Sequence, residues 1–184
     1  MNKVLVICPF PVGVAAGQRL KYEQYFDNWE ENGFQVTVSP FMDRRLWDIV
    51  YQKGYLFSKI LGTLRGYLRR CRDILRVGNF DTVYVFMWVT PFGSSFFERI
   101  YRRLSNRLIY DIEDNVLQET GNSINPLVKL IKSPSKTIFL IKNADHVITS
   151  SPFLNADCLK LNKQKSCTFI SDAMDINRFS PKNS

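Results

Sequence analysis

The chain has 184 residues, of which 45% are hydrophobic and 14% aromatic. This apolar content excludes a disordered chain and is enough to build the core of one domain. A formal net charge of +8 favours anionic partners, such as phospholipid, nucleic acid or phosphorylated substrates, without choosing among them.

Apolar runs and amphipathic stretches alternate along the whole chain. Buried strands are expected at 4–8, 34–39, 81–89, 107–112, 146–150 and 167–171. Helices are expected at 18–32, at 43–76 in two pieces broken near Gly54, after an N-cap and N1 proline at Thr90-Pro91, at 126–143 and at 152–161. Strands joined by such helices predict an α/β fold with a doubly wound, Rossmann-like parallel sheet.

The second piece of the 43–76 region is the most regular amphipathic helix of the chain. Its apolar residues recur at helical spacing from Leu56 to Leu75, and arginines flank this stripe. Such a helix can lie on an anionic membrane, or it can pack its stripe into the core and leave a solvated basic face. We expect core packing for Leu61, Leu64 and Leu68. We expect contact with membrane or lipid phosphate for Arg65, Arg69, Arg70 and Arg72.

Ligands of doubly wound sheets bind beyond the carboxyl ends of the strands, which selects the loops after residues 8, 87, 111 and 150. The first of these loops leads into a helix through Gly13, Gly17, Gln18 and Arg19. Glycines let a backbone approach a ligand closely, and an arginine can grip a phosphate. The spacing is not G-x-G-x-x-G, so the dinucleotide fingerprint is absent. A flexible loop with a surface arginine is the alternative.

The fourth expected strand ends in a polar cluster formed by Asp111, Glu113, Asp114 and Asn115. Crowded carboxylates repel one another and destabilise the fold unless cations, hydroxyls or backbone donors offset the repulsion. At the ligand edge they could orient sugar hydroxyls or accept a proton from one, which makes Glu113 and Asp114 the catalytic candidates. The alternative is that Asp114 or Asn115 only caps the next helix.

Several site classes have no support in the sequence. His146 is the only histidine and the four cysteines lack metal-ligand spacing, so we expect no metal site. No nucleic-acid-binding signature is present, so nucleic acid is not an expected partner. Pro9 and Pro11 interrupt the first apolar run, which argues against a cleaved signal peptide. We therefore expect a cytoplasmic protein that can also attach peripherally to the inner face of the membrane.

Three segments together resemble the retaining glycosyltransferases of family 4, which have two Rossmann-like halves (the GT-B fold). The segment KVLVICPFPVGVAAGQRLKYEQYFDNWEENGFQVTV has the family's strand, glycine loop, helix and G-x-x-V-x-V second strand. In LIYDIEDN, Glu113 stands where the family frequently has a histidine. The stretch ADHVITSSPFLNADCLKLNKQKSCTFISDAMDINRFSP is similar to A-D-x-V-x-x-x-S followed by I-P-N-G-V-D-x-x-x-F-x-P, with Asp172-Ala173 replacing Asn-Gly.

The resemblance implies a glycosyltransferase of the hexosyltransferase class, acting without a metal and with retention. The sugar would pass from a nucleotide-sugar to a hydroxyl of a glycan or lipid-linked acceptor. The nucleotide-sugar would be a co-substrate, and no cofactor is expected. Residues 1–175 would form the acceptor-side domain and 176–184 a linker toward an absent donor-binding domain, so the chain alone is expected to be inactive.

The same resemblance assigns roles to individual residues. Gly17 and Arg19 would lie near phosphate, and Glu113 and Asp114 near acceptor hydroxyls. Ser150 and Ser151 would line the cleft, and Trp88 would either stack on a sugar ring or form a buried wall. The alternative function is a non-catalytic Rossmann module that docks a partner chain or an anionic membrane. A second Rossmann domain with an E-x7-E pattern would favour the enzyme.

Overall fold

A computed structural model describes residues 1–113 and 134–171. Six strands form one sheet in the order β2-β1-β3-β4-β5-β6, and all five strand pairs are parallel. Their bounds are β1 Asn2–Cys8, β2 Phe34–Pro40, β3 Thr82–Phe86, β4 Leu108–Ile112, β5 His146–Thr149 and β6 Cys167–Phe169. The predicted doubly wound α/β fold with a Rossmann-like parallel sheet is confirmed.

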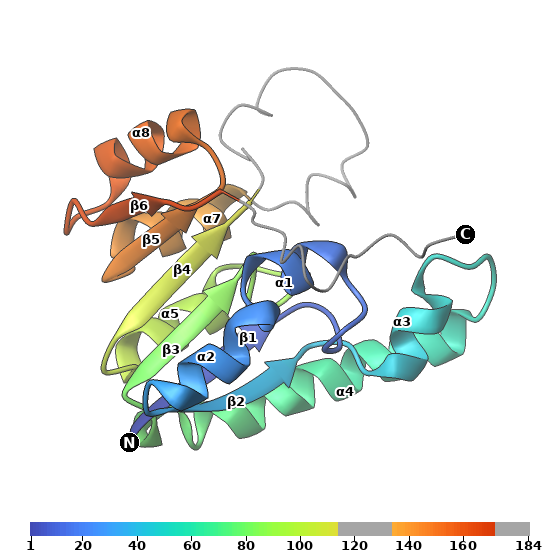
Figure 1. The fold of residues 1–184 in the computed structure, drawn as a ribbon. Helices are drawn as coiled ribbons and strands as arrows, with labels where there is room; N and C mark the ends of the chain where they lie inside the picture. Colours follow the sequence, from blue (N-terminus) through green and yellow to red (C-terminus); the bar gives the residue numbers. More distant parts are fainter. Residues whose placement is uncertain (114–133, 172–184) are drawn as a thin grey trace, which may run out of the picture.

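Helices cover both faces of the sheet, as Figure 1 shows. The described helical segments are α1 Ala16–Lys21, η1 Glu23–Tyr25, α2 Phe26–Glu31, α3 Arg44–Val50, α4 Leu56–Ile74, η2 Val77–Asn79, α5 Phe96–Leu104, α7 Pro134–Asn143 and α8 Pro152–Leu161. One face packs against Tyr22 and Phe26 of the α1–α2 region. The other packs against α5, α7 and α8 through Tyr101, Leu140 and Leu154.

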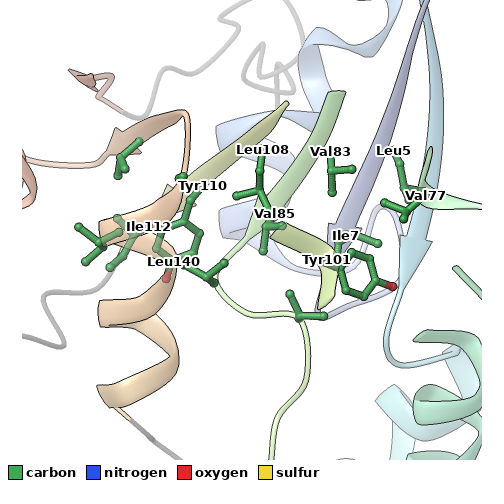
Figure 2. Packing of buried hydrophobic residues seen from close by; sticks show 14 of the residues in the cluster. Leu5, Ile7, Val77, Val83, Val85, Tyr101, Leu108, Tyr110, Ile112 and Leu140 are labelled. Atoms are coloured by element: carbon green, nitrogen blue, oxygen red, sulfur yellow. The ribbon is translucent and has the colours of Figure 1, made fainter. Parts of the chain in front are cut away.

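The strands supply apolar side chains to both layers because their residues alternate between faces. Leu5 and Ile7 of β1 join Val83 and Val85 of β3 in the larger cluster, part of which Figure 2 shows. Val4 and its alternate neighbours on β1 join the smaller cluster under α1 and α2. Strands β1, β3 and β4 are therefore buried on both sides, as predicted, whereas the edge strands β2 and β6 are only partly buried.

The strand order locates the ligand edge of the sheet. The chain passes from β1 to β2 on one side and then returns past β1 to β3 on the other. In open parallel sheets a crevice forms outside the carboxyl ends of the strands where the order reverses in this way. The loops that follow β1 and β3, at 9–15 and 87–95, meet at this point, and the end of β4 lies next to them.

Several predicted element bounds were wrong. The helix expected at 18–32 is interrupted at Tyr22, whose φ of −143° leaves the helical region. The helix expected at Thr90-Pro91 begins only at Phe96, because the Thr90 hydroxyl accepts a hydrogen bond from Lys136 and does not cap a helix. Strand β3 ends at Phe86, where the next residue turns to a positive φ of 59°. The last strand, which was expected to reach residue 171, ends at Phe169.

The break predicted near Gly54 is confirmed, because α3 and α4 are separated there and Gly54 has a φ of +82°. Of the helix expected at 126–143, the structure describes α7, and residues 126–133 lie outside the described ranges. The linker expected at 176–184 also lies outside them.

Helix α4 lies on the sheet with the face opposite to the one expected. Its buried residues are Gly62, Gly66, Arg70 and Asp73. The exposed fractions of Leu61, Leu64 and Leu68 are 37%, 54% and 60%, so the expectation that these leucines pack in the core was wrong. The glycines explain the orientation, because a helix face without side chains can approach its neighbours more closely than a leucine face can.

Gly66→Ala is expected to destabilise the fold. A Cβ at position 66 would lie 2.6 Å from both Cε1 and Cζ of Phe41, a ring that is itself buried. Overpacking of this kind costs about 1–3 kcal/mol, against about 1 kcal/mol gained from helix propensity. Urea unfolding should show a net loss, whereas Gly78→Ala should change little because nothing lies within 4 Å of its Cβ position. Equal stability of the two variants would contradict this packing.

Four tyrosines are buried in the two layers, and burial raises the pKa of each phenol above its ordinary value of 10.0. They are Tyr22, Tyr84, Tyr101 and Tyr110. Because the folded state retains phenolic protons that the unfolded chain releases above pH 10, this contribution to stability is complete below that pH and is lost as the pH rises further.

Tyr22→Phe should therefore flatten the alkaline loss of stability. The Tyr22 hydroxyl interacts only with the weakly hydrogen-bonding thiol of Cys8 among the described residues, so its removal should cost little at neutral pH. Above pH 10 the slope of unfolding free energy against pH should decrease by about 1.4 kcal/mol per pH unit, the value for one proton. The exposed Tyr51→Phe is the control and should leave the slope as in the parent chain. An unchanged slope in Tyr22→Phe would count against the burial of this phenol.

Candidate functional site

The glycine-containing segment after β1 and the acidic turn that begins at Glu113 after β4 meet at the carboxyl edge of the sheet. Gly17 lies in the first turn of α1, and Glu113 directly follows β4. A Cβ placed on Gly17 would be 2.8 Å from Oε2 and 2.9 Å from Oε1 of Glu113, so the carboxylate lies directly against the glycine backbone. Only glycine leaves room for the carboxylate in this position. The two sequence motifs therefore occupy one place in the fold.

Ser150 adds a second anchor for the acidic turn. Its Oγ donates a hydrogen bond of 2.6 Å to the carbonyl oxygen of Glu113, which fixes the end of β4 to the end of β5. Ser151 has a different role, because its Oγ accepts from the Leu154 amide at 3.2 Å and caps α8. Of the two serines expected to line the cleft, Ser150 therefore contacts the candidate site and Ser151 is engaged in capping.

Asp111 does not reach the crevice, although the sequence placed it among the acceptor-binding residues. Its side chain is buried, accepts a hydrogen bond from the Tyr84 hydroxyl, and lies 3.8 Å from Nζ of Lys21. Lys21 also donates to the Ile170 carbonyl at 2.8 Å. The carboxylate thus stabilises the contact between β3, β4 and α1 behind the site, and the prediction that it binds ligand was wrong.

Gln18 is likewise buried and supports the loop from within. Its amide group accepts from the Phe10 amide and donates to the Phe10 carbonyl, both at 3.0 Å. It also donates to Glu23, whose other carboxylate oxygen accepts from the Gly13 amide at 2.9 Å. The predicted role of Gln18 in ligand contact was wrong, because this side chain shapes the 9–15 loop. The Gly13 amide is held in the same network.

Two predicted residues lie at the margin of the site. Arg19 is exposed on α1 and forms no ion pair with another described residue, so its guanidinium is available to an anion. Trp88 is half-buried, with its ring 5.6 Å from the ring of Phe41 in an edge-on arrangement. This contact favours the buried-wall alternative for Trp88. Asp114 and Asn115 lie outside the described residues.

Arg70 joins the carboxyl ends of the strands beside the site. Its guanidinium donates to the carbonyl oxygens of Cys8 at 2.9 Å, Ser39 at 3.0 Å and Val89 at 2.7 Å. These carbonyls belong to β1, to β2 and to the loop after β3. The side chain is completely buried, so the expectation that Arg70 contacts a membrane was wrong. The five fixed donors of a guanidinium suit this role.

The charge of Arg70 is balanced within the same cluster. Asp73 lies one turn further along α4, 3.4 Å from Arg70, and accepts hydrogen bonds from the Ser39 hydroxyl and from Arg76. Burial lowers the pKa of Arg70 from its ordinary value of 12.5, and Asp73 opposes that shift. An arginine whose ordinary pKa is this high stays protonated at neutral pH. The guanidinium therefore remains charged inside the cluster.

A second buried cation holds the loop after β3. Lys136 of α7 donates to the carbonyl oxygens of Thr90 at 2.9 Å and Phe92 at 2.8 Å, and its Nζ lies 3.9 Å from Glu98. Burial lowers the pKa of Lys136 and raises the pKa of Glu98. Arg70 at Val89 and Lys136 at Thr90 and Phe92 thus hold neighbouring parts of the 87–95 loop.

Four of these supporting roles were not predicted from the sequence, although helical spacing marks all four residues. Lys21 lies three residues after the buried Gln18 on the same face of α1, although it is charged. Arg70 and Asp73 continue the small-residue row begun by Gly62 and Gly66. A charged residue in line with a buried helix face indicates a buried ionic role. Lys136 carries the same signal, because it precedes the buried Leu140 by four residues on α7.

The arrangement can orient a ligand by hydrogen bonding. The Glu113 carboxylate lies beside the backbone of Gly17, and Arg19 is on α1, the helix that carries Gly17. Within 1–113 and 134–171, no group of three or more His, Cys, Asp or Glu side chains is arranged to hold a metal ion. The chemistry available from the described side chains is that of a carboxylate and a guanidinium.

A scan against protein-family models and a search of curated proteins both find no match to this chain.

Arg70→Met should be strongly destabilising. The substitution keeps much of the side-chain volume but takes one donor from each of three carbonyl oxygens and one cation from Asp73. Removing one partner of a buried ion pair costs about 3–5 kcal/mol, whereas a surface substitution stays within about 0.5 kcal/mol. The control is Arg72→Met on the exposed side of α4. If urea unfolding gave the same stability for both variants, the proposed role of Arg70 would be wrong.

Proposed function

We propose that this chain is the acceptor-binding domain of a retaining glycosyltransferase, of the hexosyltransferase class, which moves a sugar from a nucleotide-sugar to a hydroxyl of a glycan or lipid-linked acceptor. The observation that carries the proposal is the contact between Glu113 and Gly17 at the carboxyl edge of the sheet. Two motifs separated by almost a hundred residues, each resembling a family motif, meet where parallel α/β sheets bind their ligands.

Glu113 is the proposed catalytic residue on the acceptor side, together with Asp114 from the sequence resemblance. A carboxylate accepts hydrogen bonds from sugar hydroxyls and can take a proton from the hydroxyl that attacks the sugar. The hydrogen bond from Ser150 to the Glu113 carbonyl and the contact with Gly17 restrict where the carboxylate can move. Such positioning is what a catalytic base requires.

Arg19 is the proposed contact for the phosphates of the nucleotide-sugar. It is exposed on the same helix as Gly17, so one short helix would serve both the acceptor and the donor phosphates. A guanidinium binds phosphate oxygens in a bidentate manner. The remainder of the donor site would belong to a second domain, as the resemblance implies, and the proposal requires no metal or further cofactor.

The proposed location is the cytoplasm, with peripheral attachment to the inner face of the membrane. Among the described residues, no helix combines the length and the apolar character that crossing a membrane requires. A lipid-linked acceptor would require the chain to work at a membrane surface.

Glu113→Gln tests the catalytic assignment. In a protein that joins this chain to a donor-binding domain, nucleoside diphosphate release is followed with a panel of nucleotide-sugars and glycan acceptors. Loss of general base catalysis should lower kcat/KM by about 10²–10⁴-fold. Gly17→Ala should give a smaller loss, because the new Cβ displaces the carboxylate by contact. The control Glu31→Gln, exposed at the end of α2, should leave the rate unchanged.

Two results would overturn the proposal. The first is full activity of Glu113→Gln, which would remove the carboxylate from the reaction. The second is binding of glycan or membrane by the parent protein with no release of nucleotide from any donor. That result would favour a non-catalytic Rossmann module.

A further inference from the structure

Helix α4 presents a row of uncovered apolar side chains to solvent. Leu56 and Phe57 at its start are exposed by 72% and 79%, and further exposed residues follow on successive turns. This row consists of Leu56, Phe57, Ile60, Leu61, Leu64 and Leu68, and we call it the α4 ridge. Monomeric proteins scatter exposed apolar side chains singly, so a continuous row marks a contact surface.

The α4 ridge lies in a segment without negative charge. From Ile49 to Arg72 the sequence contains no aspartate or glutamate. Of its basic residues, Arg70 is buried in the structural cluster, and three arginines remain half-exposed or exposed along the helix. They are Arg65, Arg69 and Arg72. Arg69 also donates to the Phe41 carbonyl at 3.2 Å, which holds it along the helix edge.

The apolar surface continues from α4 toward the loop after β3. The Tyr67 hydroxyl donates to the Phe92 carbonyl at 2.9 Å, and the Tyr67 ring contacts Phe97. Phe92 and Phe96 are both exposed beside this junction. The surface therefore extends to the loop that borders the candidate site.

We propose that the α4 ridge and its flanking arginines form a docking surface for an anionic phospholipid bilayer. Apolar side chains entering the acyl boundary, with arginines at the headgroup level, are the pattern of helices that lie in a membrane interface. A second copy of the chain fits less well, because the ridge is flanked by positive charge on both copies and by no acidic residue to pair with it. The inference deepens the peripheral attachment proposed above and does not depend on sugar transfer.

The test is flotation of the whole chain with two kinds of vesicle, pure phosphatidylcholine and phosphatidylcholine mixed with phosphatidylglycerol. Binding should require the anionic lipid. Phe57→Ser combined with Ile60→Ser should weaken it by tenfold or more, because two apolar side chains would no longer enter the acyl boundary. Arg65→Gln combined with Arg72→Gln should weaken it by about fivefold per arginine, and salt should have the same effect.

Matched controls lie on α8 and in the turn that follows it, at the far end of the helical layer from α4 (Figure 1). Phe153→Ser removes an equally exposed phenylalanine, and Lys160→Gln with Lys163→Gln removes two surface charges. These variants should bind vesicles as the parent does. Circular dichroism should show that all variants are folded, since every substituted side chain is exposed at least in part.

Three outcomes would overturn the inference. They are no binding to anionic vesicles, binding that the ridge variants do not weaken, and equal binding to uncharged vesicles. A concentration-dependent dimer in sedimentation equilibrium that Phe57→Ser abolishes would assign the ridge to a contact between copies. Because no sugar donor is present, failure here would leave the transfer experiment unaffected, and failure of that experiment would leave vesicle binding unaffected.

Discussion

The guanidinium of Arg70 is the group on which the ligand edge of this sheet depends. Parallel strands end with carbonyl groups that need donors. The guanidinium donates to two of them, Cys8 of β1 and Ser39 of β2, and to the Val89 carbonyl in the loop after β3. Because Asp73 balances its charge, the guanidinium can remain ionised inside the protein. The helix that carries Arg70 must then lie close to the strand ends, and Gly62 and Gly66 make that approach feasible.

This constraint explains two features on opposite sides of α4. Turning the glycines, Arg70 and Asp73 inward necessarily turns the leucines of the α4 ridge outward, so the structural cluster and the exposed apolar row have one cause. On the inner side, Arg70 and Lys136 fix the 87–95 loop beside the place where the strand order reverses at β1. The contact of Glu113 with Gly17 forms at the same edge, so the proposed sugar-transfer site and the proposed membrane surface adjoin one framework.

The strand pattern and the place of the site could be predicted from sequence, because apolar runs specify buried parallel strands and parallel strand ends share an edge. The meeting of Gly17 with Glu113 follows from that rule. The orientation of α4 could not be predicted from the sequence. Helical periodicity shows that the helix has two unlike faces but does not show which face packs inward. Gln18 and Asp111 were misassigned because a polar residue near a ligand edge can equally serve as internal support. Thr90-Pro91 failed as a helix start because Lys136, distant in sequence, engages Thr90.

The burial of Arg70 can be measured by nuclear magnetic resonance of the arginine Nε–H groups. The Nε–H of Arg70 donates to the Val89 carbonyl at 2.7 Å inside the protein, whereas Arg72 is exposed. The structure predicts a slowly exchanging arginine Nε–H signal that disappears in Arg70→Lys and persists in Arg72→Lys. An Arg70 signal that exchanges with water as fast as that of Arg72 would contradict the inward orientation of this helix face, and with it the common origin of the site framework and the α4 ridge.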